Sequence, residues 1–340
     1  MPEPKPLTPE VLLHIAGILQ IPLKGLIATI ELFDEGGTVP FIARYRKEVT
    51  GNLDEVQIRA IEEKLAYFRE LAERREMILR TIEEQGKLTD DLRARILATF
   101  DKSELEDLYL PYKPKRRTKA TIAREKGLEP LALYIWEQQK APIPLADFAV
   151  TFISEEKGVA TAADALEGAR HIVAEMISEN AVFRKALRQM MFDEGIVTAS
   201  KREDAVDEQE KFRMYYEYQE PVSKIPSHRM LAIRRGEEEN VLYFNIDLPS
   251  ERPVQWLMSH ILRQPGDWTP QLELAIQDSY KRLLNLSIQT EVRIELKQRA
   301  DTEAIRVFRE NLENLLLSPP AGQLAVLAVD PGIRTGCKLA

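Results

Sequence analysis

The chain has 340 residues, of which 44% are hydrophobic and 30% charged, and these proportions are typical of a globular protein with a buried core. Its 47 basic and 55 acidic residues give a formal net charge of -8, so overall charge does not draw it to nucleic acid, and any such binding must come from local basic patches. A single cysteine, Cys337, excludes an intrachain disulfide, and neither a signal-peptide pattern nor an apolar run of about 18 residues is present, so we expect a cytoplasmic protein that does not enter a membrane.

Helical periodicity accounts for the first part of the chain. Thr8 followed by Pro9 predicts the start of a first helix. Residues 38–52 indicate a loop or a short helix. From Leu53 to about Gln85, apolar residues recur at the spacing of one long helix, interrupted by Arg75. Further helix starts are predicted by the N-cap residues Thr89, Ser103 and Thr161, the last two in capping-box patterns.

Strand signals are rare in the middle of the chain. Residues 141–147, APIPLAD, resemble a linker. The charged and then aromatic segment 199–220 is interpreted as a long exposed helix. The first convincing strand is VLYFNIDL, residues 241–248, which is short and rich in β-forming residues. Helical spacing then returns from Pro270 to Leu317, with its weakest point at Ser287.

The end of the chain has a different pattern. After the helix breaker SPPAGQ, an apolar run leads to Asp330, a Pro-Gly turn and a second apolar run, which together predict two strands. We therefore expect a mainly α fold: an elongated multi-helix array with a helix-turn-helix-like N-terminal part, one or two short strands, and the truncated two-strand start of an α/β domain. The expected domains are residues 1–320, with a subdivision near 141–147, and residues 321–340.

The densest basic cluster lies in LYLPYKPKRRTKATIAREKG. Pro111 and Pro114 keep its start out of a helix, so its cations should project from a loop, and Tyr109 and Tyr112 offer rings on which bases stack. These cations are Lys113, Lys115, Arg116, Arg117, Lys119, Arg124 and Lys126. They are candidate phosphate contacts. The alternative interpretation is a solvated loop that pairs with the acidic segment SELED just before it.

Two smaller basic clusters are further candidates for nucleic-acid binding. Arg44, Arg46 and Lys47 surround Tyr45 in FIARYRKEVTG, where a helix-turn-helix could begin, although arginines that anchor a loop explain the pattern equally well. The third cluster, in KIPSHRMLAIRRGEEEN, is followed by glutamates that neutralise part of its charge. Its candidate contacts are Arg229, Arg234 and Arg235.

Catalytic patterns are mostly missing. The four histidines have no metal-type spacing, and no glycine-rich phosphate motif, serine-nucleophile elbow or CxxC motif occurs. Asp330, at the end of an apolar strand before a tight turn, occupies the place where ribonuclease H-like nucleases present their first metal ligand. Two-metal phosphoryl chemistry requires several carboxylates, and one strand supplies only one. We therefore predict no catalytic residue, no metal site and no cofactor.

Five segments together resemble the bacterial Tex family of transcription accessory proteins. They are TVPFIARYRKEVTGNLDEVQIR, LEDLYLPYKPKRRTKATIAREKGLEPLA, IPSHRMLAIRRGEE, DSYKRLL and LAVDPGIRTGCKLA, and they occur in the family's order with similar spacing. The resemblance implies an N-terminal helical region followed by a YqgF-type ribonuclease H-like domain, of which residues 321–340 would be the truncated start. Helix-hairpin-helix units and an RNA-binding OB domain would follow beyond this chain. In that setting Asp330 would be a vestigial acidic position.

Three hypotheses of function remain. The resemblance implies the N-terminal portion of a non-catalytic transcription accessory protein that binds nucleic acid, chiefly single-stranded RNA, through its basic loops. The net charge of -8 slightly favours a helical scaffold for a protein partner such as RNA polymerase or the ribosome. A ribonuclease H-like nuclease is disfavoured, because Asp330 has no carboxylate partners on later strands of this chain.

Overall fold

The computed structural model describes residues 6–114, 116–138, 143–320, 322–323, 325–332 and 336–340. The chain divides into two compact units, one formed by Met1–Met190 with Pro249–Ile288 and the other by Met191–Leu248 with Gln289–Ala340. Helices dominate, with two small antiparallel sheets, so the expected mainly α fold class is confirmed.

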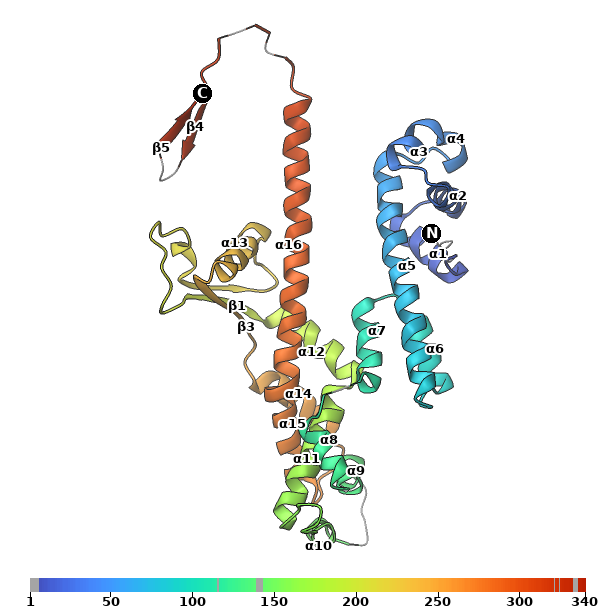
Figure 1. Ribbon diagram of the computed structural model, residues 1–340, viewed down its shortest axis with the longest axis vertical. Coiled ribbons are helices and arrows are strands. Elements are labelled where there is room, and N and C mark those ends of the chain that lie inside the picture. The colour runs from blue at the N-terminus through green and yellow to red at the C-terminus, as the bar shows by residue number, and fades with distance from the viewer. Residues whose placement is uncertain (1–5, 115, 139–142, 321, 324, 333–335) are drawn as a thin grey trace. The chain divides into compact units, whose positions relative to one another are not determined.

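The first helices of the first unit pack around one long helix. α5 contacts α1, α2, α3, α6 and α7, and Figure 1 shows the N-terminal helices lying alongside it. The apolar face of α5 includes Ile58, Ile61, Phe68 and Ile78, all buried in a common core. Arg75, which interrupts this face, is buried as well, and it donates a hydrogen bond to the Thr99 carbonyl at 2.6 Å. These helices are α1 (Pro9–Leu19), α2 (Leu23–Asp34), α3 (Val39–Tyr45), α4 (Lys47–Thr50), α5 (Glu55–Glu84), α6 (Asp90–Ala98) and α7 (Lys102–Tyr109).

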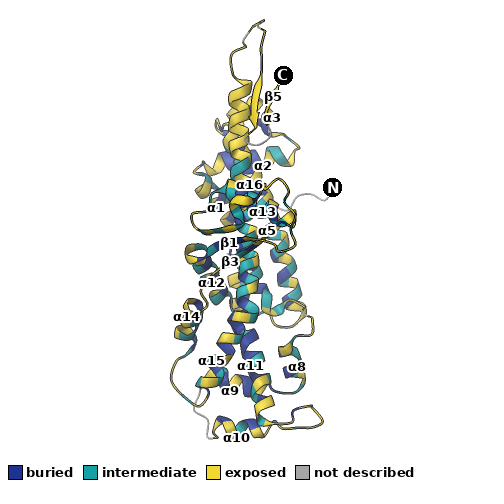
Figure 2. Ribbon diagram, turned by 90° about the vertical axis from the view of Figure 1, so that its left-hand side faces the viewer, coloured by how far each residue is buried: buried dark blue, intermediate teal, exposed yellow. Residues whose placement is uncertain are grey.

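The remainder of the first unit is arranged around α11 (Ala162–Ser178). This helix contacts α8, α9, α10, α15 and the π-helical segment η3, and it carries buried residues along its length (Figure 2). The elements of this part are η1 (Leu110–Tyr112), α8 (Lys119–Glu125), α9 (Glu129–Glu137), α10 (Leu145–Val150), α14 (Glu251–Ile261), α15 (Thr269–Asp278) and η3 (Ser279–Leu284). Two helices, α12 (Ala181–Glu194) and α16 (Asn285–Leu316), cross from the first unit into the second.

The second unit contains a three-stranded antiparallel sheet in the order β2-β1-β3. Its strands are β1 (Ile196–Lys201), β2 (Glu217–Pro221) and β3 (Leu242–Asp247), and the helix α13 (Ser227–Glu238) packs on β3. Ala199 lies opposite Tyr218 on one side and Phe244 on the other. Alternate residues such as Val197 and Ile246 are buried, so one face of the sheet belongs to a core.

The prediction of a long exposed helix over residues 199–220 is wrong. This segment completes β1, forms a turn and a short 3-10 helix, η2 (Arg213–Tyr215), and ends in β2. The turn is held by Asp207, whose carboxylate accepts hydrogen bonds from the backbone amides of Lys211 and Phe212 at 3.0 and 2.9 Å. Charged residues in this segment are therefore turn residues, and two of the three strands escaped the sequence pattern.

Helix starts were predicted with mixed success. Thr89 and Thr161 cap α6 and α11, and Thr161 forms the expected capping box with Asp164. The prediction of Ser103 as a cap is wrong, because Asp101 accepts the hydrogen bond from the Glu104 amide at 2.8 Å, so the cap of α7 lies two residues earlier.

The C-terminal segment forms two paired strands as expected, but the predicted Pro-Gly turn is wrong, because Pro331 and Gly332 lie within the first strand. β4 (Val329–Gly332) pairs antiparallel with β5 (Gly336–Leu339), and Asp330 lies within β4 opposite Lys338 rather than after the strand. Within the described parts of the chain, no single helix has both the length and the apolar character needed to cross a membrane. α1 and α2 reach that threshold only as a pair, and the chain bends by 110° between them.

Candidate nucleic-acid interface

The main basic segment begins in irregular structure and continues in a helix. Residues 113–114 and 116–118 belong to no helix or strand. Lys119 opens α8 behind the N-cap Thr118, whose hydroxyl accepts from the Thr121 amide at 3.0 Å. The expectation that all these cations project from a loop is therefore wrong for Lys119 and Arg124, which lie on α8. Lys115 lies outside the described residues.

The aromatic side chains beside this segment are not open stacking surfaces. Tyr109 is only 5% exposed, and the Arg74 guanidinium lies 5.4 Å from its ring centroid. Tyr112 is half-buried against the hydrophobic core to which Tyr109 belongs. Any nucleic-acid binding here must therefore depend mainly on charge.

Three cations of the segment are held in contacts within the protein. Arg124 donates to the buried carboxylate of Glu175 at 2.5 Å, and Lys126 donates to the Gly158 carbonyl at 2.7 Å. Arg117 forms an ion pair with Glu125 at 2.9 Å, and both of these side chains are exposed. The Arg124 contact fixes α8 on α11, so this arginine supports the fold.

The other described cations of the segment, Lys113, Arg116 and Lys119, are not held in such contacts. All three are exposed, and none has an ion-pair or hydrogen-bond partner among the described residues. The acidic segment before them does not neutralise them: Glu104 pairs with Lys185 at 3.3 Å, and Asp107 pairs with Arg184 at 2.6 Å. The interpretation of a basic loop paired with SELED is therefore not supported, and three cations remain available to phosphate.

A pocket of about 490 Å³ lies beside these cations. Lys113 and Lys119 line it together with His171 of α11 and Arg282 of η3. Arg282 comes from the DSYKRLL segment, more than a hundred residues away in the chain, and its guanidinium is held by two hydrogen bonds to Asp278, at 2.9 and 2.5 Å. The fold thus adds a fourth cation to the basic segment.

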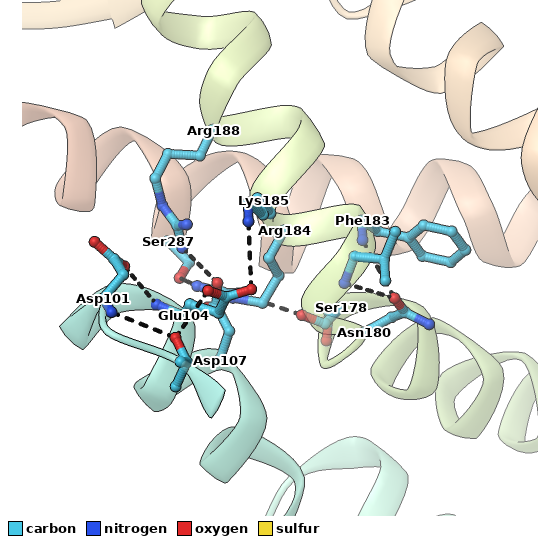
Figure 3. A network of polar contacts seen from close by, with 12 residues as sticks. Asp101, Glu104, Asp107, Ser178, Asn180, Phe183, Arg184, Lys185, Arg188 and Ser287 are labelled. Carbon is cyan, nitrogen blue, oxygen red and sulfur yellow. Dashed lines mark hydrogen bonds and ion pairs between the residues drawn. The ribbon is translucent and has the colours of Figure 1, made fainter. Parts of the chain in front are cut away.

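A buried polar network supports this pocket (Figure 3). The Asp107 carboxylate accepts from Arg184 Nε at 2.6 Å and from Arg188 Nη2 at 2.8 Å. Arg184 also donates to the Ser287 hydroxyl at 2.9 Å and to the Ser178 carbonyl at 3.3 Å. Because Arg184, Ser178 and Ser287 line the pocket too, the network joins α7, α11, α12 and α16 at its inner wall.

Burial lowers the pKa of His171 below its ordinary value of 6.5, helped by the positive charges of Lys119 and Arg282 and opposed by Asp278 and Glu167. The unfolded chain therefore binds more protons than the folded chain as the pH falls through and below 6.5. The contribution of His171 to the free energy of unfolding therefore falls as the pH is lowered through and below 6.5. Above that pH range the contribution is constant.

We expect the His171→Gln variant to lose less stability than the unmodified chain between about pH 7.5 and pH 5.5. The midpoints of urea unfolding at several pH values, followed by circular dichroism, measure this difference. Parallel pH profiles for the two proteins would contradict the assigned direction of the His171 shift.

The second cluster is open to solvent. Arg44 and Lys47 are exposed and have no ion-pair partner among the described residues, and Tyr45 is 67% exposed. Arg46 lies 5.0 Å from the centroid of the Phe41 ring and donates to the Tyr45 carbonyl at 3.2 Å. These cations therefore lie beside the exposed aromatic rings of α3. Neighbouring cations and exposed rings are the combination that binds single-stranded nucleic acid.

The third cluster lies in the second unit and is paired throughout. Arg229 forms an ion pair with Glu220 at 3.1 Å, and Arg235 forms one with Glu239 at 2.9 Å. Arg234 pairs with Glu237. As the sequence indicated, neighbouring glutamates neutralise these arginines, so this cluster is the weakest of the three candidate contacts.

Asp330 is exposed on β4. Over the ranges that the structure describes, no three or more histidine, cysteine or acidic side chains are grouped so that they could hold a metal ion.

Comparison with known families matches two regions of the chain. Residues 9–83 match the Tex-like protein N-terminal domain, and residues 140–308 match the Tex central region-like family. The chain belongs to the Tex family. Its resemblance to that family, carried by five segments, is thereby confirmed.

Relatives of this Tex-family chain are bacterial and eukaryotic. It is 47% identical over 329 residues to YdcI of Bacillus subtilis, covering 96% of this chain and 46% of that protein. It is 46% identical over 321 residues to the transcriptional accessory protein Tex of Neisseria gonorrhoeae, covering 92% and 42%. It is 30% identical over 326 residues to the human S1 RNA-binding domain-containing protein 1, covering 92% and 32%. The chain thus spans less than half the length of these relatives.

Two of the Tex segments quoted from the sequence contribute residues to the pocket, but the sequence did not predict that they meet. No local pattern places Arg282 of DSYKRLL near the basic segment, and His171 has no metal-type spacing to the other histidines. The available signal was the family resemblance itself, since it covered both the basic segment and DSYKRLL.

Proposed function

We propose that this Tex-family chain binds nucleic acid, chiefly single-stranded RNA, and that it does so without catalysing a reaction. The observation that carries the proposal is the set of exposed cations without partners among the described residues, Lys113, Arg116 and Lys119, on a chain whose net charge is -8. An acidic protein that leaves three neighbouring cations unneutralised has a local site for phosphates. Lys115, between them in sequence, belongs to the same proposed contact.

The remaining candidate contacts rank below this set. Arg44, Arg46 and Lys47 form a proposed second contact, supported by the exposed rings of Phe41 and Tyr45. The other candidates are engaged in contacts within the protein, so we propose smaller contributions from them. They are Arg117, Arg124, Lys126, Arg229, Arg234 and Arg235.

Relatives support the association with nucleic acid. One is named a transcriptional accessory protein and another an S1 RNA-binding domain-containing protein. Neither name denotes an enzyme, which supports a non-catalytic function. We further propose that residues 321–340 are the start of a ribonuclease H-like domain in which Asp330 alone would not hold catalytic metals.

The triple variant Lys113→Gln, Arg116→Gln, Lys119→Gln tests this proposal. Removal of three phosphate contacts should reduce the slope of log affinity against log salt by about 2, at about 0.7 for each contact with a single strand. Affinity for a labelled single-stranded RNA at low salt should fall by about tenfold or more. Fluorescence anisotropy at several potassium chloride concentrations measures both.

A matched control removes the same charge elsewhere. Lys24, Lys87 and Arg309 are also exposed and have no ion-pair partner among the described residues. Their triple replacement by glutamine should leave the slope unchanged. If the control variant and the test variant weaken binding equally, local contact at residues 113–119 is not the cause and the proposal fails.

A scaffold for a protein partner, such as RNA polymerase or the ribosome, is the second candidate. It is favoured by α16, where apolar side chains beyond Ala300, including Phe308 and Leu315, are exposed (Figure 2). A pocket of about 730 Å³ lined by Leu231 of α13 and by Val307 and Phe308 of α16 adds to this apolar surface. A partner that stays bound after nuclease treatment would support this function over nucleic-acid binding.

A further inference from the structure

The pocket beside α8 has an excess of positive charge. Four cations line it, Lys113, Lys119, Arg184 and Arg282, against the two carboxylates Glu175 and Glu179. With His171 neutral, the formal charge of the lining is therefore positive by two. In a chain of net charge -8 this local excess favours an anionic ligand.

The cations differ in whether they are free to bind. Asp278 occupies Nε and Nη2 of Arg282, and Nη1 has no partner among the described residues. Lys113 and Lys119 are likewise unpaired in the described structure. Glu175 is neutralised by Arg124 at 2.5 Å and also accepts from the Thr118 hydroxyl at 3.1 Å. Three positively charged side chains that line the pocket therefore keep hydrogen-bond donors free for an anion.

The pocket is lined by both buried and exposed residues. Its inner wall includes Ser178 and Arg184, both buried, and Arg184 is fixed by the Asp107 network. Lys113 and Lys119, by contrast, are exposed. The volume of about 490 Å³ lies in the range of small-ligand sites, roughly 300–1,000 Å³. A strand that follows the exposed cations can therefore place its last group in this pocket, against the buried residues of its wall.

We propose that this pocket binds the terminal phosphate of a single-stranded nucleic acid, through Lys113, Lys119 and Arg282. A terminal phosphomonoester carries a charge of about -1.5 to -2, compared with -1 for an internal phosphodiester, and offers three acceptor oxygens. Three cationic donors match this group better than they match an internal linkage. The inference rests on the proposed function, because the strand is brought to the pocket by the exposed cations.

The test compares one RNA sequence with three kinds of end: hydroxyls at both ends, a 5′ phosphate, or a 3′ phosphate. One of the phosphorylated strands should bind about tenfold more tightly than the hydroxyl-ended strand, and which one gains shows the direction of the strand. Equal affinity for all three strands would overturn the inference. The inference would also be overturned if AMP competed with the strand while neither phosphorylated strand bound more tightly than the hydroxyl-ended strand.

Variants locate the effect. Arg282→Met should abolish the preference, so that the variant binds the phosphorylated and the hydroxyl-ended strand with equal affinity. Lys281→Met is the matched control, since Lys281 is the exposed neighbour on η3 and does not line the pocket, and it should keep the preference. If Arg282→Met unfolds, Arg282→Lys and Lys119→Gln replace it, and both should reduce the preference. A preference that survives all of these changes would place the terminal phosphate elsewhere.

The two proposals fail in different ways. If the triple variant at residues 113, 116 and 119 leaves binding of the hydroxyl-ended strand unchanged, the proposed function fails. If that binding falls as expected but the end phosphate makes no difference, only the present inference is overturned.

Discussion

Replacing Asp107 by alanine is expected to lower the free energy of unfolding by about 3–5 kcal/mol. Asp107 is 4% exposed, and its carboxylate holds the guanidinium groups of Arg184 and Arg188 at 2.6 and 2.8 Å. Arg184 is only 5% exposed, so its charge cannot be hydrated when the carboxylate is removed. The cost therefore comes from a buried charge that has lost its principal anion.

Urea unfolding followed by circular dichroism measures this loss. Glu84→Ala is a suitable control, because Glu84 and Arg80 are 3.9 Å apart with about 70% of each side chain exposed, and such pairs contribute little. The double variant Asp107→Leu, Arg184→Met removes both charges and should recover part of the loss. A cost below about 1 kcal/mol for Asp107→Ala would contradict the assigned function of the network.

The helical part of the fold could be predicted because its signals are local. The long helix α5 was recognised from its apolar spacing, and Thr161 was recognised as a cap because the capping box lies within four consecutive residues. β1 and β2 were missed because the sheet is completed by β3, which pairs with β1 and lies more than twenty residues beyond β2 in the chain. A charged segment without clear alternation does not show such a partner.

The candidate site was likewise predicted only in part from the sequence. Charge density identified Lys113, Arg116 and Lys119, but it also selected Arg124, whose partner Glu175 lies 51 residues further along the chain. Whether a cation is free or engaged is a tertiary property, and the sequence does not contain it in any local pattern. For the same reason the approach of Arg282 to the basic segment could only be seen in the structure.

The second large effect is expected from a substitution at the outer edge of β3. In the sheet order β2-β1-β3, β3 is an edge strand, and such strands offer unpaired backbone groups to other chains. Here α16 covers this edge with side chains: Arg293 Nη1 donates to the Phe244 carbonyl at 3.1 Å, and Gln289 Nε2 donates to the Ile246 carbonyl at 2.8 Å. Four helical residues rise about 6 Å and two strand residues about 6.6 Å, so the spacings match.

We expect Arg293→Ala to cost about 2–3 kcal/mol and to cause self-association that increases with protein concentration. Besides its hydrogen bond to the strand, Arg293 pairs with Glu237 of α13 and lies 4.4 Å from the centroid of the Phe244 ring. Its loss therefore detaches α13 and β3 from the helix together. Urea unfolding and static light scattering measure the two effects.

Arg299→Ala separates edge protection from the other contacts of an arginine on α16. Arg299 also pairs with a glutamate, Glu295, and lies 4.6 Å from the centroid of the Phe192 ring, and 61% of its side chain is exposed. No strand carbonyl is among the contacts found for it in the described structure. Its replacement should cost less than about 1 kcal/mol and leave the protein no more prone to associate. If both variants associate equally, the cause is the loss of surface charge and not the exposure of the β3 carbonyls. If only Arg293→Ala associates, the side chains of α16 prevent association by occupying the carbonyls at the edge of β3.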